Sequence, residues 1–193
     1  MNDRHVNTAR ATETRWLMQY YFVRTAFSAL WVALAFSLGR HSPGAAAALL
    51  VVYPAWDALA NYVDMARSGG AAANRTQALN FVISVLTALA ALVALRAGAH
   101  WVLDVFGAWA ILAGLMQLGT AVRRWKDFGA QWAMILSGAQ SALAGTFFIV
   151  QSNAPTPAIE KIGGYAAVGA VYFLISALWL VVSQWRRKAA QVS

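Results

Sequence analysis

Hydrophobic residues gather in six long stretches that are separated by short polar segments. The stretches cover residues 16–38, 44–65, 77–95, 101–121, 128–150 and 162–182. Each is close to the roughly 20 residues that a helix needs to cross a hydrocarbon core of about 30 Å. Polar and apolar residues do not alternate as they do in strands, and lipid admits only helices or closed barrels. The pattern therefore predicts an all-α, polytopic membrane protein with six transmembrane helices.

The connecting segments are short, which predicts how the helices pair. Residues 39–43, 96–100 and 151–161 join successive stretches on one side of the membrane. Because short loops join antiparallel neighbours, we expect three helical hairpins. The stretches and their loops use almost the whole chain, so residues 1–193 should form a single integral membrane domain. We expect the first stretch to be retained, because it starts 15 residues into the chain and, unlike a signal peptide, contains Arg24.

The distribution of positive charge predicts the orientation. The chain is 60% hydrophobic and 11% charged, whereas about a quarter of the residues of a soluble domain are charged. Of the 15 Lys and Arg residues, 11 lie in the two terminal tails and in the second and fourth connecting segments, and three lie on the other side: Arg40, Arg96 and Lys161. This asymmetry predicts that both termini are cytoplasmic in a bacterial inner membrane. The net charge of +8 then favours the lipid bilayer as partner, and nucleic acid is not expected.

Four of the polar residues inside the predicted helices form the first candidate site. Asp57, Asn61 and Asp64 have the spacing i, i+4 and i+7, which places them on one face of the second helix. Arg24 lies within the first stretch. Since an unpaired charge at the membrane centre costs roughly 3 kcal/mol or more, we predict that Arg24 contacts Asp57 or Asp64. Such a group is either an internal salt bridge or part of a pathway for protons or ions.

A second candidate site lies at the predicted outer surface. His100 and Asp104 are spaced i, i+4 at the start of the fourth helix. An imidazole on this side would gain charge on acidification, which suits a pH-responsive site. Alternatively, Asp104 complements the helix N-terminus and His100 is an exposed loop residue. The chain has no cysteine, no catalytic motif and no credible metal-ligand set, so we expect neither an enzyme nor a cofactor or metal site.

Small residues form stripes on two helices. Gly138, Ser141, Ala142 and Gly145 share one face of the fifth helix, and Gly107 and Gly114 share a face of the fourth. Small residues let helix backbones approach closely in lipid. These glycine-striped helices could also contact a second copy of the chain or another membrane protein.

The last third of the chain resembles the HdeD-like acid-resistance membrane protein family. The residues that carry the resemblance are Arg123, Arg124, Gly129, Trp132, Gly138, Gly145, Gly163, Gly164, Tyr165, Gly169, Ile175, Ser176 and Ala177. The resemblance implies a six-span bacterial inner-membrane protein with hairpin repeats that is linked to acid or envelope stress. It implies no catalytic residues.

Three functions are compatible with these features. The first is an integral inner-membrane protein without catalytic activity that takes part in acid or envelope stress resistance. The second is a small transporter or channel for protons, ions or a small solute that uses an Arg24/Asp57 pair. The third is a membrane scaffold or assembly factor. Water access to Asp57 would separate the second from the first.

Overall fold

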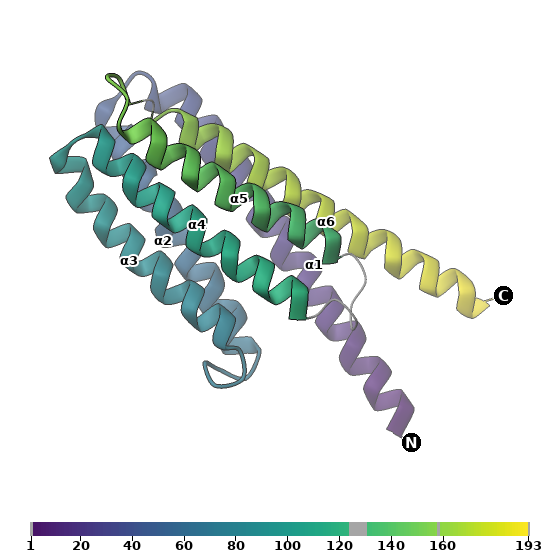
Figure 1. Ribbon diagram of the computed structural model, residues 1–193. Coiled ribbons are helices and arrows are strands. Elements are labelled where there is room, and N and C mark those ends of the chain that lie inside the picture. Colours follow the sequence, from purple (N-terminus) through teal and green to yellow (C-terminus); the bar gives the residue numbers. More distant parts are fainter. Residues whose placement is uncertain (1, 124–130, 158, 193) are drawn as a thin grey trace. The chain divides into compact units, whose positions relative to one another are not determined.

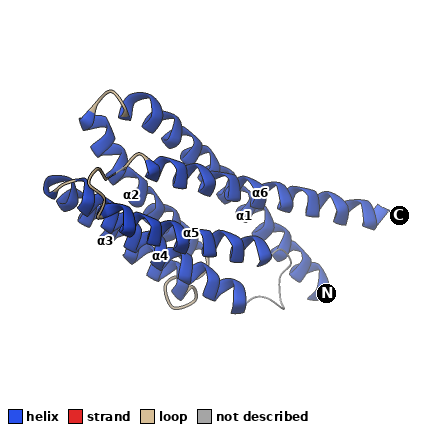
Figure 2. Ribbon diagram, turned by 45° about the horizontal axis from the view of Figure 1, so that its top comes forward, coloured by secondary structure: helices blue, strands red, loops and turns tan. Residues whose placement is uncertain are grey.

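The computed structural model describes residues 2–123, 131–157 and 159–192. These residues form six long α-helices and one π-helical turn, and no strand (Figure 2). The helices are α1 (Asn2–Leu34), α2 (Pro43–Arg67), α3 (Arg75–Ala97), α4 (Ala99–Arg123), α5 (Gln131–Ser152) and α6 (Lys161–Val192), with the turn η1 (Ala35–Gly39) after α1. The predicted all-helical, polytopic membrane fold is confirmed.

Local sequence explains where the helices begin and end. The Ser42 side chain accepts a hydrogen bond from the backbone N–H of Ala45, and Pro43 occupies the first position of α2. The Asn74 side chain caps α3 in the same way, through the N–H of Gln77. Both caps satisfy backbone donors that have no partner within the helix. Gly98 ends α3 with a φ of +128°, a conformation that residues with a side chain rarely adopt.

Two helices are longer than their predicted membrane spans. α1 begins at Asn2 rather than near residue 16, and α6 continues to Val192 rather than ending near residue 182. The hydrophobic pattern marks where a helix can cross lipid, but a polar extension can continue the same helix beyond the membrane.

Among the described residues, five helices are long and apolar enough to span a membrane. They are Thr14–Gly39, Pro43–Arg67, Arg75–Ala97, Ala99–Gly119 and Lys161–Arg186. The fifth predicted span, residues 128–150, begins outside the described residues, and α5 follows it from Gln131. That α5 crosses the membrane therefore stays a prediction, and so does the placement of both termini in the cytoplasm.

The chain divides into two compact units. The larger unit, Trp31–Tyr165, contains η1, α2, α3, α4 and α5, together with the end of α1 and the start of α6. Within it, α3, α4 and α5 lie side by side in that order (Figure 1). α4 packs most extensively on α5, followed by α2 on α3 and then α3 on α4. The predicted hairpin of α3 and α4, which the loop at 96–100 joins, therefore packs less extensively than α4 with α5 or α2 with α3.

The smaller unit consists of the part of α1 that precedes Trp31 and the part of α6 that follows Tyr165. In this unit the ring of Tyr21 stacks on that of Phe173, with the ring centroids 6.3 Å apart. Ser28, Ala170 and Ala177 are buried. That the two units form a single membrane domain stays a prediction.

Candidate intramembrane polar site

Three polar or amphipathic residues lie near the midpoints of three helices in the larger unit. Asp57 is the fifteenth of 25 residues in α2, Ser84 the tenth of 23 in α3, and Trp109 the eleventh of 25 in α4. Because all three helices are membrane-span candidates, these positions are far from either helix end. Ser84 and Trp109 are buried, and Asp57 is half-buried.

The three side chains form a hydrogen-bond chain. The Trp109 Nε1–H donates to Ser84 Oγ over 3.1 Å, and Ser84 Oγ donates to Asp57 Oδ2 over 2.7 Å. An indole N–H can only donate, and a serine hydroxyl has a single hydrogen. Ser84 must therefore accept from Trp109 and donate to the carboxylate, which fixes the direction of the chain from α4 through α3 to α2.

Asn61 adds a second donor to the same carboxylate oxygen. Its Nδ2 group lies 2.8 Å from Asp57 Oδ2 and 2.8 Å from the backbone oxygen of Asp57. The spacing of four residues had predicted that Asp57 and Asn61 share a face of the second helix, and their hydrogen bond confirms it. We call Asp57, Asn61, Ser84 and Trp109 the polar relay.

Aromatic rings surround one end of the relay. Tyr53 contacts Trp31 at a ring-centroid distance of 4.7 Å and meets Trp109 edge-on at 5.8 Å. Phe106, one turn before Trp109 in α4, meets it edge-on at 5.7 Å. All four rings are buried, which fixes the orientation of the Trp109 indole that the relay uses.

Pro54 lies inside α2, one turn before the relay. Proline has no N–H and its ring crowds the carbonyls of the preceding turn, so backbone acceptors there become accessible to other donors. In the turn before Pro54, the Trp31 Nε1–H donates to the Leu49 oxygen over 2.7 Å. The end of α1 is thereby attached to α2.

Asp64 belongs to a second, separate polar group near the end of α2. Gln77 Nε2 donates to Asp64 Oδ2 over 2.6 Å, and Asn80 Nδ2 donates to Gln77 Oε1 over 3.3 Å. Asp64 is buried, with 8% of its surface exposed. Asp57 and Asp64 therefore share the predicted helix face but belong to different polar groups. Asp57 accepts from Ser84 near the middle of α3, and Asp64 accepts from Gln77 near the start of α3.

Arg24 lies in the smaller unit, where aromatic residues contact its guanidinium group. Its Nη1 donates to the Tyr20 hydroxyl over 2.8 Å, and its central carbon lies 4.4 Å from the centroid of the Phe173 ring. A cation over an aromatic face is attracted by the ring quadrupole. The predicted contact of Arg24 with Asp57 or Asp64 would join the two units and stays a prediction.

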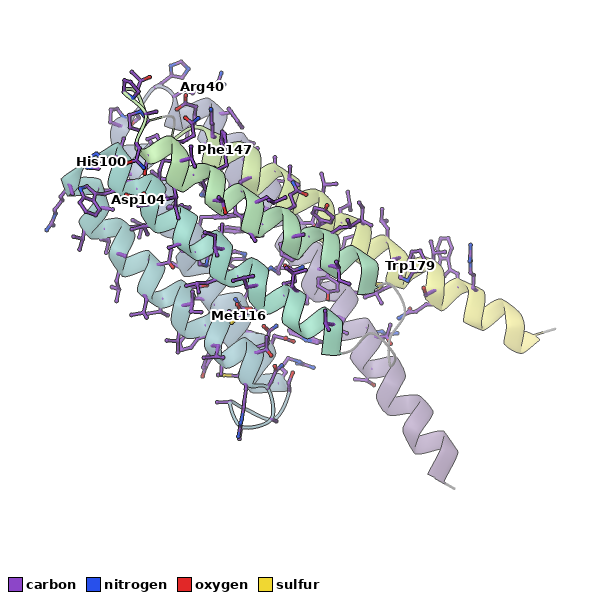
Figure 3. All side chains as sticks on the ribbon, viewed as in Figure 1. Arg40, His100, Asp104, Met116, Phe147 and Trp179 are labelled. Atoms are coloured by element: carbon purple, nitrogen blue, oxygen red, sulfur yellow. The ribbon has the colours of Figure 1, made fainter. Side chains whose placement is uncertain are left out.

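The candidate outer site lies at the start of α4. Figure 3 shows His100 and Asp104 at the same end of the larger unit as Arg40 and Phe147, with Met116 toward the other end of α4. Ser152 Oγ donates to Asp104 Oδ1 over 2.5 Å, while the His100 ring contacts that of Trp101. Asp104 thus ties α4 to the end of α5. A pH-responsive pair of His100 and Asp104 stays a prediction.

The two glycine stripes face each other across the contact of α4 with α5. A Cβ atom on Gly107 would lie 2.8 Å from the Gly145 oxygen, and one on Gly114 would lie 2.5 Å from the Gly138 oxygen. The same close approach holds from α5 toward α4. The predicted packing role of these stripes is confirmed. Contacts with a homo-oligomeric or other membrane-protein partner through these helices stay a prediction.

Two serines take part in these helix contacts through hydrogen bonds that the sequence did not predict: Ser141 in the contact of α4 with α5, and Ser84 in the polar relay. Ser141 Oγ donates to the Ala110 oxygen over 2.9 Å and lies 2.8 Å from the Tyr165 hydroxyl, so it joins α5 to α4 and to the start of α6. Ser84 was missed as a site residue. In the sequence, Ser84 stands out only as a polar residue at the midpoint of an apolar helix. Single serines are common in membrane helices, so this position alone does not indicate a site.

One family model matches part of the chain. Residues 82–150, just over a third of the chain, match the family described as a short repeat of unknown function (DUF308). This family includes HdeD-like membrane proteins. No curated protein and no solved structure matches the chain.

The matched segment differs in position from the residues that carry the sequence resemblance. It begins in α3 and ends in α5, so it leaves out Gly163, Tyr165 and the rest of α6. It includes both glycine stripes and two members of the polar relay, Ser84 and Trp109. The chain is thus a helical membrane protein in which the segment that matches this family includes the contact of α4 with α5.

Proposed function

We propose that this chain is an inner-membrane protein of the HdeD-like type, without catalytic activity, that contributes to survival of acid or envelope stress. The observation that carries the proposal is the match of residues 82–150 to a family that includes HdeD-like proteins. The resemblance in residues 123–185 supports it from an overlapping part of the chain. The positive charge on the predicted cytoplasmic side supports the inner membrane as its location.

The relay offers a chemical reason for a link to acid. Asp57 is an ionisable group that accepts hydrogen bonds from Asn61 of its own helix and from Ser84 of α3, and Trp109 of α4 donates in turn to Ser84. All three helices are membrane-span candidates. A proton on this carboxylate would remove the charge that strengthens those hydrogen bonds. A membrane protein with such a group can respond to acid without catalysing a reaction.

Survival of a deletion strain after an acid challenge tests the proposal. The strain is complemented with wild type, with Asp57→Asn, or with Asp64→Asn as a matched control in the other polar group. We expect the deletion to reduce survival, wild type and Asp64→Asn to restore it, and Asp57→Asn to fail. Restoration by all three would keep the stress function and make Asp57 structural. Unchanged survival of the deletion strain would refute the stress function.

A transport function is the second candidate, and the central position of Asp57 favours it. Ionisable groups in the interior of a membrane protein commonly line pathways for protons or ions. In vesicles that contain the purified protein and a trapped pH-sensitive dye, a pathway through Asp57 would give a proton flux that Asp57→Asn abolishes and Gly119→Ala retains. A flux equal to that of empty vesicles would exclude this candidate.

A further inference from the structure

We propose that Asp57 is a proton-binding site inside the membrane and that Ser84 and Trp109 detect whether the proton is bound. The ligand is a proton from the aqueous phase. Its uptake forms one O–H bond on the carboxylate and requires no other reactant. The inference deepens the proposed stress function by naming its site, but it stands on the hydrogen bonds of the relay.

The direction of the hydrogen bonds shows which oxygen of Asp57 acts as the acceptor in the relay. Asp57 Oδ2 accepts from Ser84 Oγ at 2.7 Å and from Asn61 Nδ2 at 2.8 Å. Because the only hydrogen of the Ser84 hydroxyl is committed to this bond by the indole of Trp109, Oδ2 has to be an acceptor. An oxygen that accepts two hydrogen bonds is not the one that carries a proton.

A proton therefore has two distinct outcomes at Asp57. On Oδ2 it would displace Ser84 or Asn61, and both are buried, so a donor would lose its acceptor away from water. On Oδ1 it would leave the relay geometry intact but remove the negative charge. Hydrogen bonds to a charged acceptor are about twice as strong as neutral ones, so either outcome weakens the attachment of α2 to α3 and α4.

The other members of the relay, Asn61, Ser84 and Trp109, carry no ionisable group that takes up a proton in this range. The side chains that α3 and α4 present to the relay, Ser84 and Trp109, are neutral, and the ionisable residues Arg75, Arg96 and Asp104 lie toward the ends of those helices. On α2 itself, Tyr53 lies one turn before Asp57 and Asp64 two turns after it. In the smaller unit, Arg24 is the charged residue that the sequence predicts as a partner of Asp57.

Infrared difference spectroscopy of the reconstituted full-length protein tests the site. Spectra are recorded while the pH is lowered from about 8 to about 3, across the range in which carboxyl groups take up protons. We expect a protonated-carboxyl band that disappears in Asp57→Asn and persists in Asp64→Asn. Asparagine at 57 retains an acceptor for Ser84 and Asn61, so it removes the proton site and leaves the relay in place.

Two further variants test whether the relay detects the proton. In Ser84→Ala and in Trp109→Phe the Asp57 band should remain but change its frequency, because the hydrogen bonding of the carboxyl group changes. Thr87→Val, which alters a hydroxyl that bonds only within α3, should leave the band unchanged. If Asp57→Asn does not accumulate in the membrane, Asp57→Glu replaces it, and the band must move.

The outcomes separate this site from the proposed function. A wild-type spectrum that Asp57→Asn does not alter overturns the proton site, whatever the survival experiment shows. A carboxyl band whose frequency stays the same in Ser84→Ala and in Trp109→Phe overturns detection through the relay. A band that behaves as expected, together with unchanged survival of the deletion strain, keeps the site and refutes the stress function.

Discussion

At the scale of single residues, the main feature is one carboxylate oxygen that accepts two hydrogen bonds. Asp57 Oδ2 receives Asn61 from its own helix and Ser84 from α3, and Ser84 receives Trp109 from α4. In lipid, no water replaces a lost hydrogen-bond partner. Removal of one member of the relay therefore costs the stability of the protein the full penalty of an unsatisfied donor or acceptor. The relay therefore contributes to the alignment of three helices.

Replacement of Ser84 should show this contribution. Ser84→Ala leaves the Trp109 N–H without its acceptor and removes one donor from Asp57, so we expect a loss of about 1–3 kcal/mol in the free energy of unfolding. Thr87→Val is the matched control. Thr87 is also buried on α3, but its hydroxyl donates to the Ile83 oxygen of the same helix. The control should change stability by less than about 0.5 kcal/mol. Unfolding in detergent micelles measures both, and equal effects would contradict the role of the relay.

The predicted contact of Arg24 with Asp57 has its own test. Arg24→Asp and Asp57→Arg should each reduce the amount of folded protein, because each leaves like charges in the membrane. The double exchange should restore folding if the two residues form a pair. Arg24→Asp with Asp64→Arg tests the alternative partner. Failure of both double variants would exclude either pair.

At this scale the sequence predicted part of the relay. The spacing of Asp57 and Asn61 follows from helix geometry alone, so their common face could be derived without a structure. The involvement of Ser84 and Trp109 depends on which faces of α3 and α4 turn toward α2. Both helices are apolar almost all round, so their sequences carry little information about that rotation.

At the scale of helices, the contact of α4 with α5 depends on glycine. Gly107 faces Gly145 and Gly114 faces Gly138, an antiparallel register in which each glycine meets the backbone of the other helix. Close backbone approach increases the dispersion contacts that hold helices together in lipid. The stripes were predictable from the sequence, but their mutual register was not.

Two alanine substitutions in α4 should have opposite effects. In Gly114→Ala the new methyl group would lie 2.5 Å from the Gly138 oxygen and 2.7 Å from the Ala142 nitrogen, so the helices must separate. We expect a loss of about 1–3 kcal/mol in stability. In Gly119→Ala the methyl group meets nothing within 4 Å. Alanine should there stabilise α4 by about 0.5–1 kcal/mol, because glycine is the weaker helix former.

Thermal unfolding in micelles compares the two variants. A midpoint that falls for Gly114→Ala and rises or stays constant for Gly119→Ala is the expected result. Equal midpoints would show that α4 and α5 do not pack in this register. Gly107→Ala provides an independent check, since its methyl group would meet Ile149 at 2.7 Å.

At the scale of the whole molecule, the number of helices that cross the membrane sets the sides on which the two termini lie. Five described helices qualify by length and apolarity. The charge asymmetry predicts six crossings, because both termini carry the excess of Lys and Arg. If α5 crosses the membrane, the number of crossings is six and both termini lie on the same side. If it does not, the number is five and the termini lie on opposite sides.

Labelling of single cysteines measures the topology directly, because the chain contains no cysteine of its own. His41→Cys and Thr156→Cys should react with a membrane-impermeant maleimide in intact cells from which the outer membrane has been removed. Ser68→Cys should react only after lysis. All three residues are exposed, so burial does not confound the result. A protected Thr156→Cys would show that α5 does not cross and that the termini lie on opposite sides.

The sequence by itself determined that this chain is helical and belongs in a membrane. Stretch length, apolar composition and the backbone requirement for hydrogen bonds in lipid allow no other class, and they depend on no contact between distant residues. The tertiary structure alone decided that Asp57 receives a hydrogen bond from Ser84 of α3, that Trp109 of α4 donates to Ser84, that the glycines meet in pairs, and that Asp104 accepts from Ser152. These contacts depend on helix rotation and register. In lipid an apolar helix gains little from one rotation over another, so local sequence leaves both undetermined until small and polar residues from different helices meet.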